Sequence, residues 1–396
     1  MASFGILALS VAAIQGAVAA VTFTVPGKAH SGGLKYAPLD PAPVGISFEF
    51  FAFPSYFTNV TATTQCLSNW KDLTGIWPPI RIGGTTQDRA LYDSSTSAYV
   101  VYSVSSPSDA PASLTFGSSF MTLAGSYDGS VVVGLNRGKN QIQNTIDAAK
   151  VAVSEVKNLL AIELGNEPEY YSGAGQPIAS GSWSPAIDAA SQNNWDISVG
   201  SAVKKAPIIQ AGNSNDSPPT WGAAELIATE NATYPEEERL QCRRRSGQVC
   251  GRWITCMGAP YYGAYAATDF LAKASYLTAL DDGSSNYATY VSFDSDGAPL
   301  KALLYNSDYF SGSGSRSSQS FVLQGLTGSS LKAKRLTAAS AQSRVDQGAT
   351  VTYGGQSFTD GNCNVSGTET YETLAVSNGQ ITVTINASEA LVVLLQ

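Results

Sequence analysis

The sequence predicts an α/β fold in which parallel strands alternate with helices, followed by an antiparallel β-sandwich. Between residues 44 and 212, short apolar runs of strand length alternate with helical patterns, a spacing typical of right-handed βαβ units. From Tyr287 onward, apolar residues recur at every second position, and turns such as Asp296-Gly297 separate the runs. The 396 residues suffice for one large and one smaller domain.

Five apolar runs and two helical patterns make up the α/β half. The strands are expected near 44–51, 78–84, 130–135, 159–165 and 206–212. A helix is predicted at 61–73, and a second at 140–157, where Ile142, Ile146, Ala149 and Val153 share one face. The Ser-rich residues 93–117 are predicted to be an excursion with short strands, and residues 189–203 are less regular.

The C-terminal half begins with a helix that Pro260-Tyr261-Tyr262-Gly263 opens. Period-two strands are expected at 287–293, 298–306, 318–323, 331–336, 380–385 and 390–395. These strands predict a β-sandwich of about 110 residues. We therefore divide the chain into 1–20 (signal peptide), 21–43 (N-terminal strand and connector), 44–283 (α/β barrel-type domain) and 284–396 (β-sandwich).

Composition narrows the chemistry that this chain can perform. The formal net charge of −8 argues against a nucleic-acid partner, which needs a basic face. His30 is the one histidine, so neither a histidine-based zinc site nor a Ser-His-Asp triad is expected. Cys242, Cys250 and Cys256 lack the paired spacing of a zinc knuckle. We therefore expect no metal and no cofactor, and acid/base chemistry that depends on carboxylates.

The N-terminus indicates a secreted protein. Residues 4–20 are apolar and small, as in a signal peptide cleaved close to Val21. No later stretch is long and apolar enough to span a bilayer, so no membrane association is expected. Five glycosylation sequons agree with an extracellular protein: Asn59, Asn215, Asn231, Asn364 and Asn386.

The strongest candidate site lies at the end of the fourth strand. Residues 159–165 form an apolar run that ends in Gly165, and Asn166-Glu167 follows on a turn that Pro168 stiffens. In a (β/α)8 barrel the chemistry sits at the carboxyl ends of the strands, so this pair falls where an active site belongs. The competing interpretation is an N-capping turn with a solvated glutamate.

A second carboxylate, Glu49, lies in the apolar first strand and needs partners there, because an isolated buried charge is costly. A structural salt bridge and a sugar-binding role are both open. The second strand ends in Gly83-Gly84, which allows close backbone approach, and polar side chains follow.

Several segments together resemble one known family. In chain order they are Ile46-Ser47-Phe48-Glu49-Phe50, Ile80-Arg81-Ile82-Gly83-Gly84-Thr85-Thr86-Gln87-Asp88, Gly134-Leu135-Asn136, Ile162-Glu163-Leu164-Gly165-Asn166-Glu167-Pro168-Glu169, Leu304-Tyr305-Asn306-Ser307-Asp308-Tyr309, Lys334-Arg335-Leu336-Thr337 and Ala387-Ser388-Glu389-Ala390-Leu391-Val392-Val393. The set resembles glycoside hydrolase family 79, which holds β-glucuronidases and heparanase-like enzymes, and is most similar to its secreted fungal members. The resemblance covers roughly residues 22–212 and 258–396.

The resemblance implies a (β/α)8 TIM-type catalytic barrel, and a β-sandwich that includes the N-terminal strand near Val21. It implies retaining hydrolysis of a β-glucuronide, in which one carboxylic acid protonates the leaving oxygen and a second carboxylate, about 5–5.5 Å away, attacks the sugar. Glu167 matches the acid/base, and Asn166 matches the residue that binds the sugar 2-hydroxyl. Glu49, Gly84, Thr85, Gln87 and Asp88 would line the sugar pocket. Partners would be glucuronide-bearing oligosaccharides, polysaccharides or proteoglycan glycans.

The sequence departs from the family at the nucleophile, a glutamate in a Gly-Glu-Thr-like context before the segment that resembles Pro260-Tyr261-Tyr262-Gly263. No such segment is present, and residues 222–257 hold an Arg/Cys-rich block unlike the rest of the chain. We interpret this block as the replacement of a deleted stretch, from a retained intron or a splicing error, which would leave the barrel incomplete. The alternatives to an active enzyme are a catalytically inactive carbohydrate-binding relative and a truncated gene product.

Overall fold

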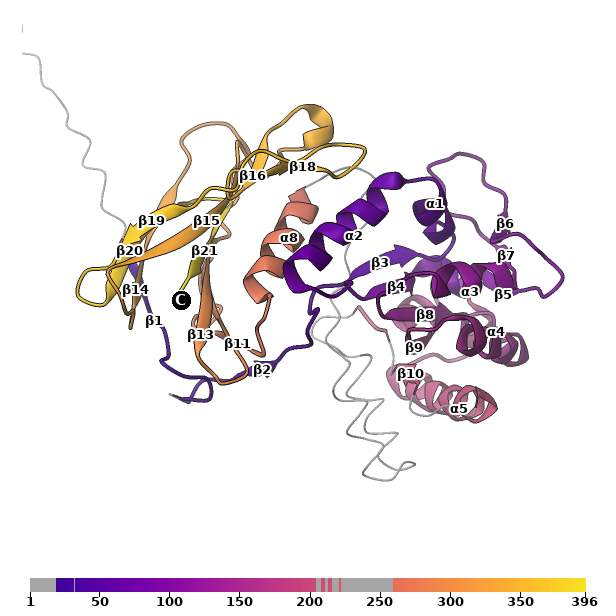
Figure 1. Ribbon diagram of the computed structural model, residues 1–396. Coiled ribbons are helices and arrows are strands. Elements are labelled where there is room, and N and C mark those ends of the chain that lie inside the picture. The colour runs from indigo at the N-terminus through magenta and orange to yellow at the C-terminus, as the bar shows by residue number, and fades with distance from the viewer. Residues whose placement is uncertain (1–18, 32, 204–207, 211–212, 216–220, 222–258) are drawn as a thin grey trace, which may run out of the picture.

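The computed structural model describes residues 19–31, 33–203, 208–210, 213–215, 221 and 259–396 (Figure 1). An α/β domain lies on one side of the molecule and a β-domain on the other, with helices α2 (Thr61–Thr74) and α8 (Ala259–Leu271) between them. The predicted signal peptide, apart from its last two residues, and the block at 222–257 lie outside the described residues. Within these ranges, no helix is long and apolar enough to cross a membrane.

Five parallel strands form the sheet of the α/β domain, in the order β10-β9-β8-β4-β3. Their bounds are β3 Ile46–Glu49, β4 Ile80–Gly83, β8 Val131–Leu135, β9 Leu159–Leu164 and β10 Ile209–Gln210. Strands adjacent in this sheet are consecutive in the predicted strand order, which is the arrangement of successive strands in a (β/α)8 barrel. The first four strand predictions are confirmed, and of the fifth, predicted at 206–212, the described residues 208–210 include β10 while the others lie outside the described residues. Because the strands are parallel, their carboxyl ends lie at one edge of the sheet.

The two faces of this sheet have different chemistry, because side chains alternate along a strand. Apolar side chains such as Ile80, Ile82 and Ile162 belong to the hydrophobic core. The alternating positions Arg81 and Glu163 carry polar side chains toward the other face. A strand that is apolar on its helix-covered face can thus present charged groups on the interior face of a barrel.

In the described part of the domain, five helices accompany these strands: α1 Phe53–Thr58, α2 Thr61–Thr74, α3 Ser118–Gly125, α4 Ile142–Glu155 and α5 Pro185–Val203. The helices predicted at 61–73 and 140–157 are confirmed as α2 and α4. The buried face of α4 is Thr145, Ala148, Ala149 and Ala152, so Ile142, Ile146 and Val153 flank the buried stripe and do not form its centre.

The interpretation of residues 189–203 as less regular is wrong, because they belong to the continuous helix α5. Its buried positions include Asp188, Gln192, Asn193 and Asp196. A helix that buries polar side chains shows no apolar stripe at helical spacing, which is the signal that would have identified it.

The Ser-rich excursion folds into a three-stranded sheet, as predicted, in the order β5-β7-β6. Its strands are β5 Ala90–Tyr92, β6 Val100–Tyr102 and β7 Leu114–Phe116. Phe116 packs on Phe50 and Phe120, with ring centroids 5.0 and 5.4 Å away. This excursion is therefore attached to the core at the point where β3 ends.

Two sheets form the β-domain, in which every strand pair except β1–β14 is antiparallel, and the predicted sandwich is confirmed. The larger has the order β16-β15-β21-β13-β12-β11-β2, with β19 also paired to β15, and the smaller has the order β1-β14-β20. The bounds are β1 Val21–Thr24, β2 Ala37–Pro38, β11 Tyr276–Ala279, β12 Tyr287–Phe293, β13 Pro299–Asn306, β14 Ser318–Gln324, β15 Ser330–Ala338, β16 Val351–Tyr353, β19 Glu372–Ala375, β20 Gln380–Asn386 and β21 Glu389–Leu394. Strands β17 Ser357–Phe358 and β18 Val365–Ser366 form a separate hairpin.

Side chains from both sheets meet in one core, which includes Phe293, Leu304, Phe321 and Ile385. The N-terminal strand β1 pairs in parallel with β14, with Val21 opposite Phe321, and β2 pairs with β11. Strand β11 starts before the boundary set at 284 from the sequence, because its four residues are too few to show a period-two pattern.

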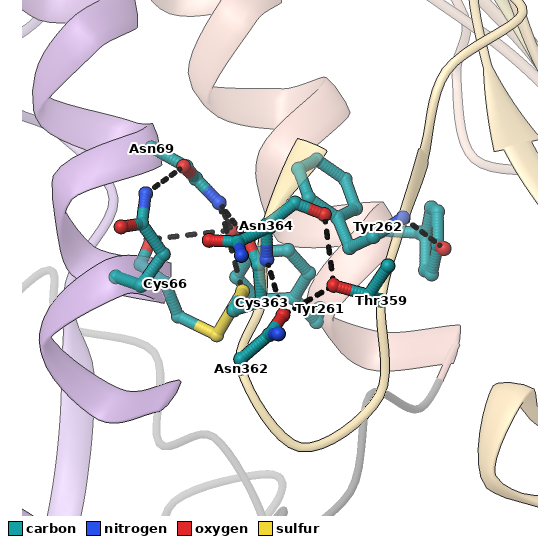
Figure 2. The surroundings of a disulfide bond; sticks show 10 residues. Cys66, Asn69, Tyr261, Tyr262, Thr359, Asn362, Cys363 and Asn364 are labelled. Carbon is teal, nitrogen blue, oxygen red and sulfur yellow. Dashed lines mark hydrogen bonds between the residues drawn. A yellow bond between two sulfur atoms is a disulfide. The ribbon is translucent and has the colours of Figure 1, made fainter. Parts of the chain in front are cut away.

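A disulfide between Cys66 and Cys363 joins the two domains, across 297 residues of sequence (Figure 2). Cys66 lies on α2 and Cys363 follows the β17 strand of the β-domain. Asn69 Nδ2 donates to the Cys363 carbonyl at 2.8 Å and to the Tyr261 hydroxyl at 3.1 Å. The bond therefore closes a contact that α2, α8 and the β-domain share.

Replacing both cysteines, Cys66→Ser and Cys363→Ser, should lower the free energy of unfolding by about 2–4 kcal/mol, because the unfolded chain loses a long-range cross-link. Urea unfolding of the oxidised wild type and the double variant measures the difference. A reducing agent should destabilise the wild type and leave the double variant unaffected at this bond. Equal urea midpoints for the two proteins would contradict the prediction.

Candidate active site

Glu167 lies just past the end of β9, in a turn whose backbone has an unusual left-handed conformation. Gly165 and Glu167 both have positive φ, at 81° and 51°. A Cβ at Gly165 would lie 2.1 Å from the Tyr171 hydroxyl, so this position needs glycine. The Glu167 amide donates to the Asn213 carbonyl at 2.7 Å, and the side chain is half-buried. A non-glycine residue in the left-handed region is a common sign of a functional turn.

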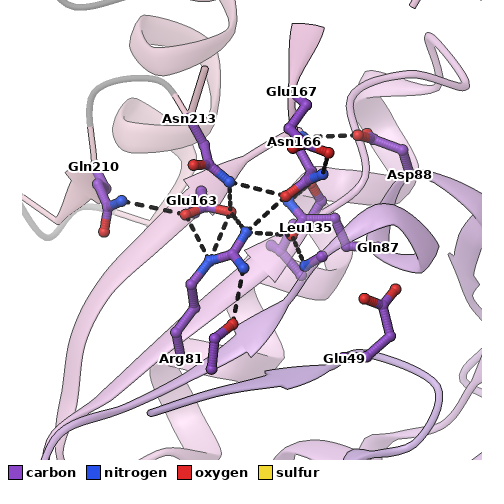
Figure 3. Close-up of polar contacts among 12 residues, drawn as sticks. Glu49, Arg81, Gln87, Asp88, Leu135, Glu163, Asn166, Glu167, Gln210 and Asn213 are labelled. Atoms are coloured by element: carbon purple, nitrogen blue, oxygen red, sulfur yellow. Dashed lines mark hydrogen bonds and ion pairs between the residues drawn. The ribbon is translucent and has the colours of Figure 1, made fainter. Parts of the chain in front are cut away.

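Asn166 holds the carboxylate of Glu167. Its Nδ2 donates to Glu167 Oε2 at 3.0 Å. Its own oxygen, Oδ1, accepts from Arg81 Nη2 and from Asn213 Nδ2, each at 2.9 Å (Figure 3). Because two donors fix the oxygen, the amide NH2 group is turned toward Glu167. The Asn166 side chain is therefore oriented before any ligand arrives.

Beneath this pair lies a buried ion pair between Arg81 on β4 and Glu163 on β9. Arg81 Nε donates to the two Glu163 oxygens at 3.2 and 3.0 Å, and Arg81 Nη1 donates to Ser47 Oγ at 2.9 Å. Gln210 and Asn213 also donate to Glu163, at 3.2 and 3.3 Å. The charges are thus paired and hydrogen-bonded, as buried charges must be.

Asp88 ties together the loops after β4, β8 and β9. Oδ1 accepts from the amides of Arg137 and Gly138 at 2.9 and 2.8 Å. Oδ2 accepts from the amide of Asn166 and the hydroxyl of Tyr171, both at 2.7 Å. Burial raises the pKa of Asp88 above its ordinary value, although these four hydrogen bonds act to lower it. Asp88 therefore fixes the turn that carries Glu167.

Gln87 lies behind the site and is fully buried. Its Oε1 accepts from the Gly84 amide at 3.0 Å, and its Nε2 donates to the Leu135 carbonyl at 3.4 Å. A Cβ at Gly134 would lie 2.2 Å from that Oε1, so Gly134 makes room for it. The side chains of Gln87 and Asp88 are buried and their polar atoms are hydrogen-bonded to the protein, and their predicted place in the wall of the sugar pocket stays a prediction.

Glu49 lies at the end of β3 and its carboxylate is held on one side by Thr86. Oε1 accepts from the Thr86 amide and the Thr86 hydroxyl, both at 2.6 Å. A Cβ at Gly84 would lie 2.1 Å from Oε2, so Gly84 leaves space for this oxygen. Among the described residues, none forms an ion pair with Glu49, which disfavours the salt-bridge alternative. Thr85 is exposed at the same turn.

Because of Glu49, the free energy of unfolding of the chain should change with pH in the acid range. Burial raises its pKa above the ordinary 4.5, against the hydrogen bonds from Thr86 and the charges of Arg81 and Arg89, which lower it. The folded chain then binds more protons than the unfolded chain, so the contribution of Glu49 is fully present below pH 4.5 and is lost as the pH rises through the folded-state pKa.

The variant Glu49→Gln keeps an acceptor for both Thr86 bonds and removes this titration. The free energy of unfolding of the wild type, minus that of Glu49→Gln, should therefore decrease as the pH rises from 4 toward neutrality. Urea unfolding at a series of pH values measures this difference. A difference that stays constant or increases with pH would contradict the raised pKa.

A second buried ion pair, between Arg137 and Asp188, lies next to the segment that follows Glu167. Arg137 Nη2 pairs with Asp188 on α5, and the guanidinium lies 5.6 Å from the ring centroid of Tyr171 and 5.8 Å from that of Trp183. Sequence reasoning missed Arg137, Asp188 and Tyr171. It also gave no role to Arg81 and Glu163, which lie in two different apolar strands.

The described site offers carboxylate chemistry. In the part of the chain that the structure describes, no cluster of three or more His, Cys, Asp or Glu residues could hold a metal ion. What the geometry provides is a half-buried carboxyl group, Glu167, on a rigid turn, with an oriented amide beside it. Such a group can exchange a proton with a ligand atom, and the amide can bind a neighbouring hydroxyl.

A barrel-type sheet with a carboxylate at its strand ends, followed by an antiparallel β-domain, is the architecture of a class of glycoside hydrolases. Residues 286–392 match the glycosyl hydrolase family 79 C-terminal beta domain. The chain is similar to a 4-O-α-L-rhamnosyl-β-D-glucuronidase from Fusarium oxysporum of known crystal structure. The two sequences are 39% identical, the match covers 95% of this chain and 100% of the Fusarium chain, and the structures superpose with a TM-score of 0.85. The chain therefore belongs to glycoside hydrolase family 79, as its sequence motifs indicate.

Two curated relatives are similar over shorter segments. A β-glucuronidase of Aspergillus niger is 36% identical over 149 residues, which are 34% of this chain and 27% of that protein. A β-glucuronidase of Neurospora crassa is 33% identical over 165 residues, 38% of this chain and 29% of that protein. The matched segments thus span less than a third of the length of either relative.

Proposed function

We propose that this chain is a β-glucuronidase that hydrolyses a terminal β-glucuronide, with Glu167 as the general acid/base. The observation that carries the proposal is the hydrogen bond from Asn166 to Glu167 on a strained turn at the end of a barrel strand. In a retaining mechanism Glu167 would protonate the leaving oxygen, and Asn166 would bind the sugar 2-hydroxyl more strongly in the transition state. The names of the relatives in Aspergillus, Neurospora and Fusarium support a glucuronide as substrate.

The test is the release of 4-nitrophenol from its β-glucuronide at mildly acid pH by the full chain. A 4-O-rhamnosyl-β-glucuronide is tested in parallel, because the Fusarium structure holds a Rha-GlcA ligand. Hydrolysis of either substrate supports the proposal. Absence of hydrolysis, with the chain folded, would overturn it.

A second candidate function follows from the predicted lack of the nucleophile segment. Without a second carboxylate the site would bind a glucuronide and not cleave it. Incubation with a 2-deoxy-2-fluoro-β-glucuronosyl fluoride, followed by peptide mapping, separates the two. A covalent adduct on a glutamate or aspartate identifies the nucleophile and supports the enzyme, whereas saturable glucuronide binding without adduct or turnover supports the carbohydrate-binding relative.

We further propose that the protein is secreted and glycosylated. Asn59, Asn215 and Asn364 are exposed, so a glycan at these sequons meets no packing obstacle. Asn386 is half-buried and its Nδ2 donates to Glu389 at 3.1 Å, which makes it the least suitable of the described sequons. Expression in a secreting eukaryotic host, with and without removal of N-linked glycans, tests both statements by mass.

A further inference from the structure

An exposed apolar segment lies on the excursion that follows β4. Tyr99, Val101, Tyr102 and Val104 are 39%, 51%, 42% and 37% exposed. They are four of the thirteen large exposed hydrophobic residues in the described ranges, and they fall within six positions of sequence. Exposed apolar side chains within one short segment indicate a contact site, and because side chains alternate along a strand, Val101 and Tyr102 lie on opposite faces of β6. We call residues 99–104 the tyrosine strip.

The strand that carries the strip, β6, is the edge of its sheet and pairs with β7. Exposed edge strands are usually protected by charged residues or proline. Residues 94–108 contain no Asp, Glu, Lys or Arg, and they are rich in serine. The strip therefore suits a partner that is uncharged and hydroxylated, and it offers no cation for a sulfate or phosphate.

The strip is connected to the candidate active site through a short series of contacts. Thr86 Oγ1, which donates to Glu49, accepts from the Phe51 amide at 3.3 Å. The Phe51 ring meets the Tyr102 ring edge to face, with centroids 5.4 Å apart and planes at 87°. Phe51, two residues after Glu49 in the sequence, thus joins the strip to the segment that carries the Glu49 carboxylate.

Hydrogen bonds attach β5, the other edge of the sheet that carries the strip, to the barrel domain. Asn144 Nδ2 donates to the Tyr92 carbonyl at 2.8 Å, and the Tyr92 amide donates to Asn144 Oδ1 at 3.0 Å. Asn136 Nδ2 donates to the Ala90 carbonyl at 2.9 Å. A surface fixed in this way is placed before a ligand binds, which favours binding because little motion is lost.

We propose that Tyr102 of the tyrosine strip, together with Phe51, binds the neutral sugar units to which the glucuronide is attached, and so selects uncharged glycans over sulfated ones. The inference rests on the proposed function of the site. A tyrosine ring can pack on the apolar C–H face of a sugar while its hydroxyl remains hydrated, and rings of this kind line most small-ligand sites.

The experiment compares two substrates of the full chain, 4-nitrophenyl β-glucuronide and the β-glucuronide of lactose. Tyr102→Ala should lower the ratio of kcat/KM for the lactoside to kcat/KM for the nitrophenyl substrate by about tenfold. Tyr102→Phe keeps the ring and should keep most of the ratio. The matched control is Tyr309→Ala, which removes a tyrosine of the β-domain that is 65% exposed. It should leave the ratio unchanged.

Calorimetric titration with the same lactoside tests the strip even if the chain does not turn over. Weaker binding of the lactoside by Tyr102→Ala, with an unchanged thermal midpoint, supports the inference whether or not the proposed hydrolysis occurs. An unchanged Kd and ratio would overturn it. So would a preference for a sulfated lactoside, or a dimer in solution that Tyr102→Ala dissociates, since the strip would then serve an anionic glycan or a second copy of the chain.

Discussion

Glu167→Gln should lower kcat toward a β-glucuronide of an ordinary sugar by about 10²–10⁴-fold, the usual contribution of a general acid. The amide has the shape of the carboxyl group, and its oxygen can still accept the hydrogen bond that Asn166 Nδ2 makes at 3.0 Å. It cannot deliver a proton to the leaving oxygen. Steady-state rates on the lactoside and on the 4-nitrophenyl substrate measure the change.

The dependence on the leaving group makes this prediction specific to an acid. 4-Nitrophenolate leaves with little protonation, so the variant should lose much less on the nitrophenyl substrate in the first step than on the lactoside. Glu169→Gln is the matched control, because Glu169 lies on the same turn, is half-buried and accepts from the Asn215 amide at 2.5 Å. It should retain activity within a few-fold. An equal loss on both substrates, or full activity of Glu167→Gln, would remove Glu167 from the mechanism.

The location of Glu167 could be predicted from the sequence because its signal is local. An apolar run of strand length, a glycine and a carboxylate before Pro168 are all within ten residues. The structure adds the reason for the glycine, which is the Tyr171 hydroxyl where a Cβ would stand. The five parallel strands were predictable on the same ground, since each is a short apolar run.

The supports of the site were not predictable, because they join groups far apart in sequence. Arg81 and Glu163 are 82 residues apart, and Arg137 and Asp188 are 51 apart. Nothing local shows that two charges in different apolar strands face each other. The predicted role of Gln87 and Asp88 in the sugar pocket stays a prediction, since a sequence does not show whether a polar side chain faces a ligand or the protein.

The same limit applies to α5 and to the disulfide. Helix α5 buries Asp188, Gln192 and Asp196, so its hydrophobic pattern is weak although the helix is long. Cys66 and Cys363 belong to different domains, and with five cysteines in the chain the sequence left the pairing open. In each case the missing information is the packing of one element against another.

Arg81→Met should lower the free energy of unfolding by about 3–5 kcal/mol, the cost of leaving a buried charge without its partner. Glu163 is 1% exposed, and without Arg81 its remaining donors are the neutral amides of Gln210 and Asn213. Urea unfolding at neutral pH measures the loss. Lys150→Met is the matched control: the Lys150–Asp147 pair is exposed, with a separation of 3.7 Å, and should contribute at most about 1 kcal/mol.

The double variant Arg81→Met/Glu163→Gln tests whether Arg81 and Glu163 contribute to the free energy of unfolding as a coupled pair or independently. If the cost of Arg81→Met comes from the unpaired carboxylate, adding Glu163→Gln should restore part of the stability, so the double variant is less damaged than the sum of the two single variants. Costs that simply add would contradict a coupled ion pair.

Arg81 also donates to Asn166 Oδ1, which links the stability of the sheet to the orientation of the turn that carries Glu167. Arg81→Lys separates these two effects, because lysine keeps the charge and lacks the planar fork that reaches Glu163 and Asn166 together. Arg81→Lys should therefore recover much of the stability lost in Arg81→Met while kcat stays low. A lysine variant with wild-type kcat would show that Asn166 needs only Asn213 to hold its amide toward Glu167, and that Arg81 serves the fold alone.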